Sequence, residues 1–337
     1  MSMEQSFCAE QARQSGIDIA GSASEHSLYV AIACSPPWES NDLDSKGIPE
    51  NLRLLGKAFY DDYDRYQTRF LLIHNDQLQL ENRTRVLVFR KPSGLATGYE
   101  KQEFHLRDIH DVAPLVQQIV MGEPVSATPV DEPSRDILVC THGSRDRCCS
   151  RFGAPIYHQA RKLVAELGLQ NTRIWQTSHI GGHRMAPTAI DFPSARYYGY
   201  LDAESLRSVL THEGDIRTLD TIYRGWGLLP WAAQVLEKQL LLTHGWDWLN
   251  CAAIAQVIEQ DEAEDFNRVE LSYKTPGGEQ QIYRAEVVAD PSRTAQLKGS
   301  CASQSLSEIT PYSVKSLVCS RWGLRPRAKP KVQTIEN

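Results

Sequence analysis

Apolar runs alternating with polar segments predict a mixed α/β chain. In the first third, runs rich in branched and aromatic residues predict strands at 28–33, 70–73 and 85–89, and helical spacing predicts a helix over 49–60. Residues 121–135 are polar and include three prolines and a glycine, which is typical of a linker. We therefore expect an N-terminal α/β domain over residues 1–125.

The middle of the chain has a clear order of strand, helix, strand, loop, strand, strand, helix. Gly168 is placed to end the first of these helices, and Asp202 is placed to cap the second. A polar, charged loop is expected over 140–152. The predicted strands are 136–140, 173–177, 188–192 and 196–200, and the predicted helices are 154–167 and 203–210. These elements define a central domain over residues 133–213.

The last third, residues 214–337, reads as a C-terminal extension. Two helices are predicted over 231–242 and 248–259, and a hairpin is predicted from strands at 268–273 and 281–288 around Pro276-Gly277-Gly278. Basic residues then gather near prolines, and we expect them to form a solvated, mobile tail rather than a binding arm. They are Arg321, Arg325, Arg327, Lys329 and Lys331.

Composition narrows the function classes. The formal net charge of −6 over 337 residues argues against a general nucleic-acid binder. No apolar run approaches the roughly 20 residues that span a bilayer, and the N-terminus lacks the pattern of a secretion signal. Eight cysteines are sparse for a disulfide scaffold. We expect a cytoplasmic protein without a membrane partner, in which clustered cysteines indicate metal or redox chemistry.

Two short segments concentrate soft metal ligands. Cys140, Cys148 and Cys149 lie in the first, and His179 and His183 lie in the second. Each segment follows a predicted strand, so loops from neighbouring strands can bring these side chains to one point. Thiolate and imidazole together suit zinc, an iron–sulfur cluster or copper, and the spacing alone leaves these open. Cys8, Cys34, Cys251, Cys301 and Cys319 receive no predicted role.

Other chemistries fit less well. The segment from His179 to His183 lacks the glutamate that a zinc protease places after its first histidine. The chain has no G-x-S-x-G elbow, no phosphate-binding P-loop and no G-x-G-x-x-G after a strand. Cys148-Cys149 is not a C-x-x-C pair, which weakens a thiol–disulfide exchange interpretation. No carboxylate pair is placed for glycoside hydrolysis.

The motifs VCTHGSRDRCC, TSHIGGHRMAP and YYGYLD resemble the sucrase/ferredoxin-like family. That family is akin to the thioredoxin-like [2Fe–2S] ferredoxins and is similar to the fungal actin-patches-distal protein. The resemblance implies a thioredoxin-like ferredoxin domain over 133–213, with Cys140 and Cys149 as the first two cluster ligands. His179 and His183 replace the C-x3-C pair of those ferredoxins. It thus implies two thiolates on one iron and two imidazoles on the other, as in Rieske centres.

The resemblance makes one-electron transfer the leading function, in an electron carrier rather than an enzyme, with unknown redox donor and acceptor proteins as partners. Cys148 is expected to pack or to point outward. His142 is a candidate hydrogen-bond donor in the second layer, rather than a ligand. Two alternatives stay open. One is a structural zinc module with the same four ligands in a scaffold protein, and the other is a thioredoxin-like thiol enzyme that uses Cys148 or Cys149. Arg145, Arg147 and Arg184 either steer an acidic partner or solvate the loops.

Overall fold

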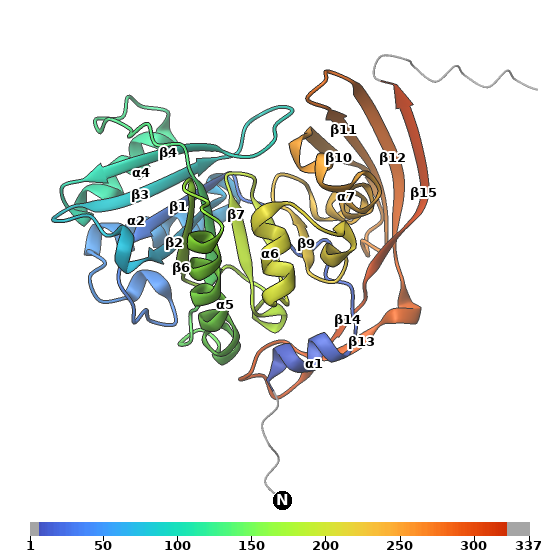
Figure 1. Cartoon of the computed structure of the whole chain (residues 1–337), viewed down its shortest axis with the longest axis horizontal. Coiled ribbons are helices and arrows are strands. Elements are labelled where there is room, and N and C mark those ends of the chain that lie inside the picture. The colour runs from blue at the N-terminus through green and yellow to red at the C-terminus, as the bar shows by residue number, and fades with distance from the viewer. Residues whose placement is uncertain (1–6, 322–337) are drawn as a thin grey trace, which may run out of the picture.

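A computed structural model describes residues 7–321 of the chain (Figure 1). Within these residues, one mixed sheet of nine strands has the order β4-β3-β1-β2-β6-β5-β7-β8-β9. Its strands are β1 (Leu28–Ala33), β2 (Thr68–His74), β3 (Thr84–Arg90), β4 (Glu100–Leu106), β5 (Arg135–Cys140), β6 (Thr172–Thr177), β7 (Ala189–Phe192), β8 (Arg196–Tyr198) and β9 (Tyr223–Trp226). The predicted strands of the first two thirds are therefore confirmed, and β4 and β9 are additions.

The sheet joins the first and middle thirds of the chain. Strands β1 and β2 are parallel, and β2 continues into β6 through the antiparallel pairs Ile73↔Thr177 and His74↔Gln176. Strands β5 and β6 are parallel, whereas β7 runs antiparallel to both β5 and β8. This one sheet crosses the boundaries predicted near 125–133 and at 213–214, and the division into three domains stays a prediction.

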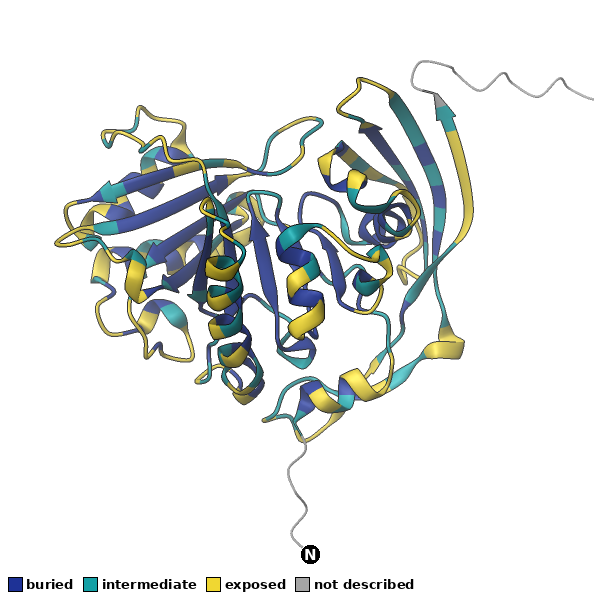
Figure 2. Cartoon of the chain, in the orientation of Figure 1, coloured by how far each residue is buried: buried dark blue, intermediate teal, exposed yellow. Residues whose placement is uncertain are grey.

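Helices cover the sheet. Successive residues of a strand point to opposite faces, so one strand contributes to two cores. Residues 28, 30 and 32 of β1 pack in a core with α2 (Glu50–Asp61) and α4 (Val112–Met121), whereas residues 29 and 31 belong to the larger core. That larger core includes inner residues of α5 (Arg147–Glu166) and α6 (Ala203–Thr211). Figure 2 shows α5 and α6 exposed on their outer sides and buried toward the sheet. As predicted, the side chain of Asp202 caps α6 by accepting from the Ser205 N–H.

A second sheet, antiparallel and in the order β10-β11-β12-β15, packs around α7 (Trp231–His244) (Figure 1). Its strands are β10 (Ala252–Gln260), β11 (Phe266–Lys274), β12 (Gln280–Ala289) and β15 (Tyr312–Arg321). The predicted hairpin is confirmed as β11 and β12. A two-stranded sheet of β13 (Ala295–Lys298) and β14 (Leu306–Ile309) lies beside the N-terminal helix α1 (Cys8–Gln14) (Figure 1). A further short helix, α3, spans Tyr63–Tyr66.

The predicted helix over 248–259 is wrong. A short 3-10 helix, η6 (Gly245–Asn250), is followed by the edge strand β10. The alanine, glutamine and glutamate residues of β10 are typical of a helix. However, Ala253, Ala255 and Val257 pack on the core while Ile254 and Ile258 are exposed. This period of two and the pairing with β11 make it a strand. Up to residue 321, the extension therefore contains one α-helix and two small sheets rather than a helix pair.

The predicted basic tail lies outside the described residues, apart from the backbone of Arg321 at the end of β15. Its mobility stays a prediction. Among residues 7–321, none of the helices has the length and apolar character that crossing a membrane requires.

Candidate metal centre

The segment that contains both vicinal cysteines begins a helix earlier than expected. The predicted loop over 140–152 is too long, because α5 begins at Arg147. The side chain of Asp146 caps it by accepting from the backbone N–H of Cys148 at 2.8 Å. The charged residues of this turn made the segment look like a loop, although it also contains an apolar stripe that includes Cys149 and Gly153. Cys149 therefore lies in the first turn of α5, where helix geometry fixes its direction.

Gly153 brings α5 close to the end of β5. A Cβ atom at this position would lie 1.9 Å from the backbone oxygen of Cys140. No side chain fits there without moving backbone, so glycine permits the close crossing of helix and strand. The crossing places the first turn of α5 beside Cys140.

Three of the predicted ligands converge. Cys140 ends β5, Cys149 lies in α5 and His179 follows β6, and a ligand atom of each lies within 4.8 Å of the other two. Cys149 Sγ is 3.8 Å from His179 Nδ1. Both cysteines are buried, with 1% of their surface exposed, and His179 is half-buried. A buried pair of soft thiol ligands beside a partly exposed imidazole suits a soft metal ion or an iron–sulfur cluster.

The fourth predicted ligand, His183, lies next to this group. It begins the 3-10 helix η4 (His183–Met185), and its ring centre is 5.2 Å from that of His179. Its Nε2 donates to the backbone oxygen of Gly299 at 2.5 Å, whereas its Nδ1 is buried without a hydrogen-bond partner among the described residues. His183 is not within the 4.8 Å group. A histidine that donates one ring N–H to a carbonyl oxygen and keeps the other nitrogen free has the arrangement of a metal ligand.

The two thiols influence each other strongly. The hydrogen bond from Cys149 and the nearby His179 hold the pKa of Cys140 well below its usual range, despite burial. The contact with Cys140 and burial instead raise the pKa of Cys149. One proton is readily lost from this pair, and the second is lost only if positive charge compensates both thiolates. A cation between them supplies that charge, so the donor set fits a metal centre.

Neighbouring side chains hold the backbone of the ligand loops. His142, which is 2% exposed, accepts from the His179 N–H at its Nδ1 and donates from Nε2 to the Glu39 oxygen. His142 thus holds the backbone of a predicted ligand by accepting a hydrogen bond from it, whereas the sequence had suggested a second-layer donor. Two arginines without a predicted role also hold this loop: Arg69 donates to the His179 oxygen, and Arg224 donates to the Gly181 oxygen. Arg224 lies in the buried strand β9, and an arginine in a buried segment is the signal that could have identified it.

One side of the centre borders solvent. A cavity of about 670 Å³ is lined by Asp42, Arg69, His142, Arg145 and His179, among others. Of the three arginines singled out in the sequence, Arg145 faces this cavity, and Arg147 lies over the ring of Phe7 at 5.8 Å. Arg184 is half-buried. His179 therefore lies between the buried thiols and this solvent-facing cavity, whose lining includes charged side chains.

Cys148 does not belong to this group. It is fully buried and lies 3.4 Å from Cys8 and 3.2 Å from Cys301, measured between sulfurs. Of the two outcomes expected for Cys148, packing or pointing outward, the structure shows packing. The choice of Cys149 as the ligand stays a prediction, and it is supported because Cys149 is the one that meets Cys140.

Comparison with known proteins gives one family and two distant relatives. The sequence pattern of the family described as Sucrase/ferredoxin-like matches residues 19–225. Altered inheritance of mitochondria protein 32 of Debaryomyces hansenii is 32% identical over 97 residues, which cover 26% of this chain and 34% of that protein. The protein of the same name from Meyerozyma guilliermondii is 23% identical over 106 residues, 29% of this chain and 38% of that protein. The chain thus spans about a third of the curated relatives it matches. No solved structure matches.

Proposed function

Because the chain belongs to the sucrase/ferredoxin-like family, we propose that it is an electron-transfer protein with a [2Fe–2S] cluster bound by Cys140, Cys149, His179 and His183. The observation that carries the proposal is the convergence of Cys140, Cys149 and His179 within 4.8 Å, with the free Nδ1 of His183 beside them. When bound, such a cluster supplies one-electron transfer.

We also propose that residues 133–213 form a thioredoxin-like unit. Parallel strands β5 and β6 are linked by α5, and β7, β8 and α6 follow with β7 antiparallel to β5. This order supports the assignment, because it places the two ligand segments at the ends of adjacent strands.

The residues around the centre have separable tasks. Buried Cys140 and Cys149 offer thiolates away from water, which protects them from oxidation and exchange. Burial lowers the pKa of His183, which favours the neutral ring that a ligand needs. His142, Arg69 and Arg224 hold the backbone of the histidine loop through His179 and Gly181.

The solvent-facing cavity beside His179 gives redox partners access. Arg69 and Arg145 line it together with Asp42, so both signs of charge are present. We propose that donor and acceptor proteins approach on this side, with the two arginines contacting acidic groups of the partner. A cytoplasmic location, and the absence of nucleic-acid and membrane partners, stay proposals. Fractionation of the cells that make the protein tests the location.

The thiol-enzyme alternative is not favoured. Cys148 is 0% and Cys149 is 1% exposed, and burial together with thiol contacts raises the pKa of both. Reactive cysteines combine access to solvent with a lowered pKa.

Analysis of iron and acid-labile sulfide in protein purified without oxygen tests the proposal. The expected result is about two of each per chain with visible absorption. Zinc alone at this centre, in protein made with ample iron and an intact cluster-assembly system, would contradict it and favour the structural zinc module with the same ligands.

A further inference from the structure

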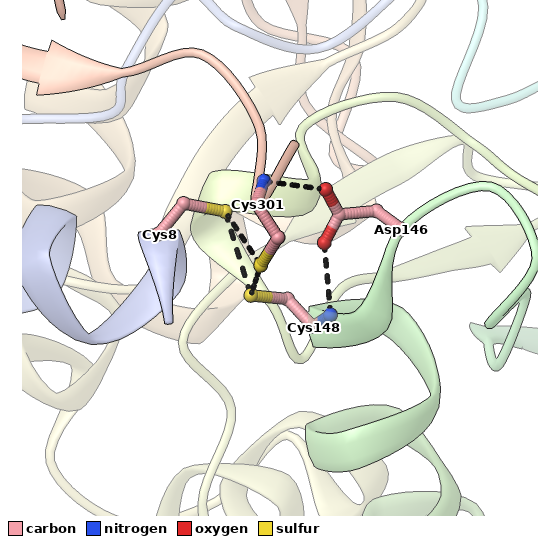
Figure 3. Close-up of side chains that lie close together, drawn as sticks. All are labelled: Cys8, Asp146, Cys148 and Cys301. Carbon is pink, nitrogen blue, oxygen red and sulfur yellow. Dashed lines mark hydrogen bonds between the residues drawn. The ribbon is translucent and has the colours of Figure 1, made fainter. Parts of the chain in front are cut away.

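Three cysteines that were not predicted to act together lie close to one another beside the candidate centre. Cys8, Cys148 and Cys301 lie with their sulfurs 3.4, 3.2 and 3.7 Å apart, and a carboxylate oxygen of Asp146 is within 4.8 Å of all three (Figure 3). We propose that these four residues bind a zinc ion, separate from the centre formed around Cys140. The proposal is independent of the proposed function, because the two groups share no ligand.

The separations suit one ion rather than a disulfide. A disulfide needs its sulfurs about 2.05 Å apart, whereas thiolates around a tetrahedral zinc ion lie about 3.8 Å apart at a Zn–S distance of about 2.3 Å. The observed triangle has a circumscribed radius of about 2.0 Å, so a point about 1.1 Å above its plane is 2.3 Å from every sulfur. An ion needs little movement of the side chains to reach all three.

Asp146 supplies the fourth ligand and braces two of the others. Its Oδ1 accepts from the Cys148 N–H at 2.8 Å, and its Oδ2 accepts from the Cys301 N–H at 2.9 Å (Figure 3). Each carboxylate oxygen has a second lone pair for an ion. Ligating carboxylates in metal sites are commonly hydrogen-bonded in this way.

The surroundings also suit a structural zinc site. Cys8 and Cys148 are 1% and 0% exposed and pack with Ala9 and Ala186, and Phe7 and Phe152 close the edge. Cys301 is half-buried and leaves a path for the ion from solvent. Three soft thiolates and one carboxylate in a closed four-ligand set favour zinc over magnesium or calcium, which prefer oxygen ligands.

The ion would connect three segments that are far apart in the sequence. Cys8 belongs to α1, Cys148 to α5, and Cys301 to the turn between β13 and β14. Gly299, two residues before Cys301, is the residue whose oxygen accepts from His183. Zinc at this position would tie the turn between β13 and β14 to α1 and α5, which gives the ion a structural task separate from the candidate redox centre.

Zinc and iron measured together in the full chain test the proposal. We expect about one zinc per chain in addition to the iron, and near-complete loss of zinc in Cys301→Ser and in Cys8→Ser with iron unchanged. Cys301→Ser changes a half-buried turn residue and is the variant expected to fold well. Cys251→Ser, at a buried cysteine outside both groups, is the matched control and should retain both metals.

Co²⁺ added to the Cys149→Ser variant gives an independent readout, because absorption of a cluster would otherwise cover the signal. Thiolate-to-cobalt bands that disappear in the double variant Cys149→Ser/Cys301→Ser support the site. The proposal is overturned if purified protein neither contains nor retains Zn²⁺ after gel filtration. It is equally overturned if mass analysis finds a disulfide within the group, or if Cys301→Ser removes iron instead of zinc.

Discussion

His183 donates from Nε2 to the backbone oxygen of Gly299, across 116 residues of sequence. A carbonyl oxygen only accepts, so this nitrogen bears the proton and the neutral ring presents a lone pair at Nδ1. Burial lowers the pKa of His183, which favours that neutral form near pH 7. The C-terminal part of the chain therefore selects the tautomer and the direction of a candidate ligand in the middle of the chain.

This hydrogen bond leads to a redox prediction. A proton on the far nitrogen of an iron-bound imidazole is held more tightly when the iron is reduced, so the reduction potential should fall as pH rises. Neutral imidazoles should also place it above the roughly −400 mV of all-cysteine plant-type clusters. His183→Cys should lower the potential and weaken its pH dependence. Redox titrations from about pH 6 to pH 10 measure both effects.

His110→Cys is the matched control, because His110 is an exposed histidine away from the centre and should leave the potential unchanged. A wild-type potential that stays flat over this pH range would contradict proton coupling. If it is also near the all-cysteine value, ligation by His179 and His183 loses its support.

The vicinal cysteines give a second prediction. Cys149→Ser should abolish the cluster, because it removes a thiolate from the group with Cys140 and His179. Cys148→Ser should keep most of the iron, because its sulfur lies with Cys8 and Cys301 instead. Iron content and visible absorption of the two variants check this pair, and each serves as the control for the other. Loss of iron in Cys148→Ser alone would shift the assignment by one residue.

A third prediction concerns Gly153. Alanine is favoured over glycine by about 1 kcal/mol in a helix interior, so propensity alone predicts that Gly153→Ala stabilises. Here the added Cβ would meet the Cys140 oxygen at 1.9 Å, so we expect loss of stability and of bound iron. Gly94→Ala, where nothing lies within 4 Å of the new Cβ, is the control. Thermal unfolding measures the stability of both variants, and iron analysis measures the bound iron. A Gly153→Ala variant that is more stable than the wild type would refute the close crossing of α5 and β5.

Local pattern was sufficient for much of the centre. Apolar runs predicted the strands that became β5 and β6, and polar segments after adjacent strands were expected to meet, as Cys140 and His179 do. The pattern failed where one face of an element is polar. The charged first turn of α5 resembled a loop, and the alanine- and glutamine-rich strand β10 resembled a helix.

Contacts between distant segments could not be predicted from one sequence. Cys8 and Cys301 are 293 residues apart and meet only because α1 packs beside β13. The bond between Gly299 and His183 uses the backbone oxygen of Gly299, and a backbone atom leaves no pattern in the sequence. In both cases the information lies in how the C-terminal extension folds back, which has no local periodicity.

The final prediction concerns a largely buried ionic network between strands β4, β5 and β6 of the large sheet. Asp136, fully buried in β5, accepts from Arg173 at 2.7 Å, from Lys101 at 2.6 Å and from Trp175 at 2.8 Å. Asp136→Asn takes one carboxylate away from buried Arg173 and half-buried Lys101, which both keep an ion pair with Glu103. Removal of one member of a buried pair typically costs about 3–5 kcal/mol, and the remaining Glu103 places the expected cost at the lower end of that range. Asp76→Asn breaks an ion pair of a 66% exposed carboxylate with Arg161 and should cost about 0–1 kcal/mol. Urea unfolding of both variants near pH 7 measures the difference.

The cost of Asp136→Asn should depend on pH in one direction. Burial alone would raise the pKa of Asp136, but the hydrogen bond and charge of Arg173 and Lys101 outweigh it, so the pKa lies below its usual value. A carboxyl with a lowered pKa in the folded state contributes its stability above the unfolded value of about 3.9 and loses it as pH falls through the folded value. The gap between wild type and Asp136→Asn should therefore stay constant from about pH 7 to pH 5 and shrink below about pH 4. A gap that instead widens in acid would show that the carboxyl is protonated in the folded protein and that the network is not ionic.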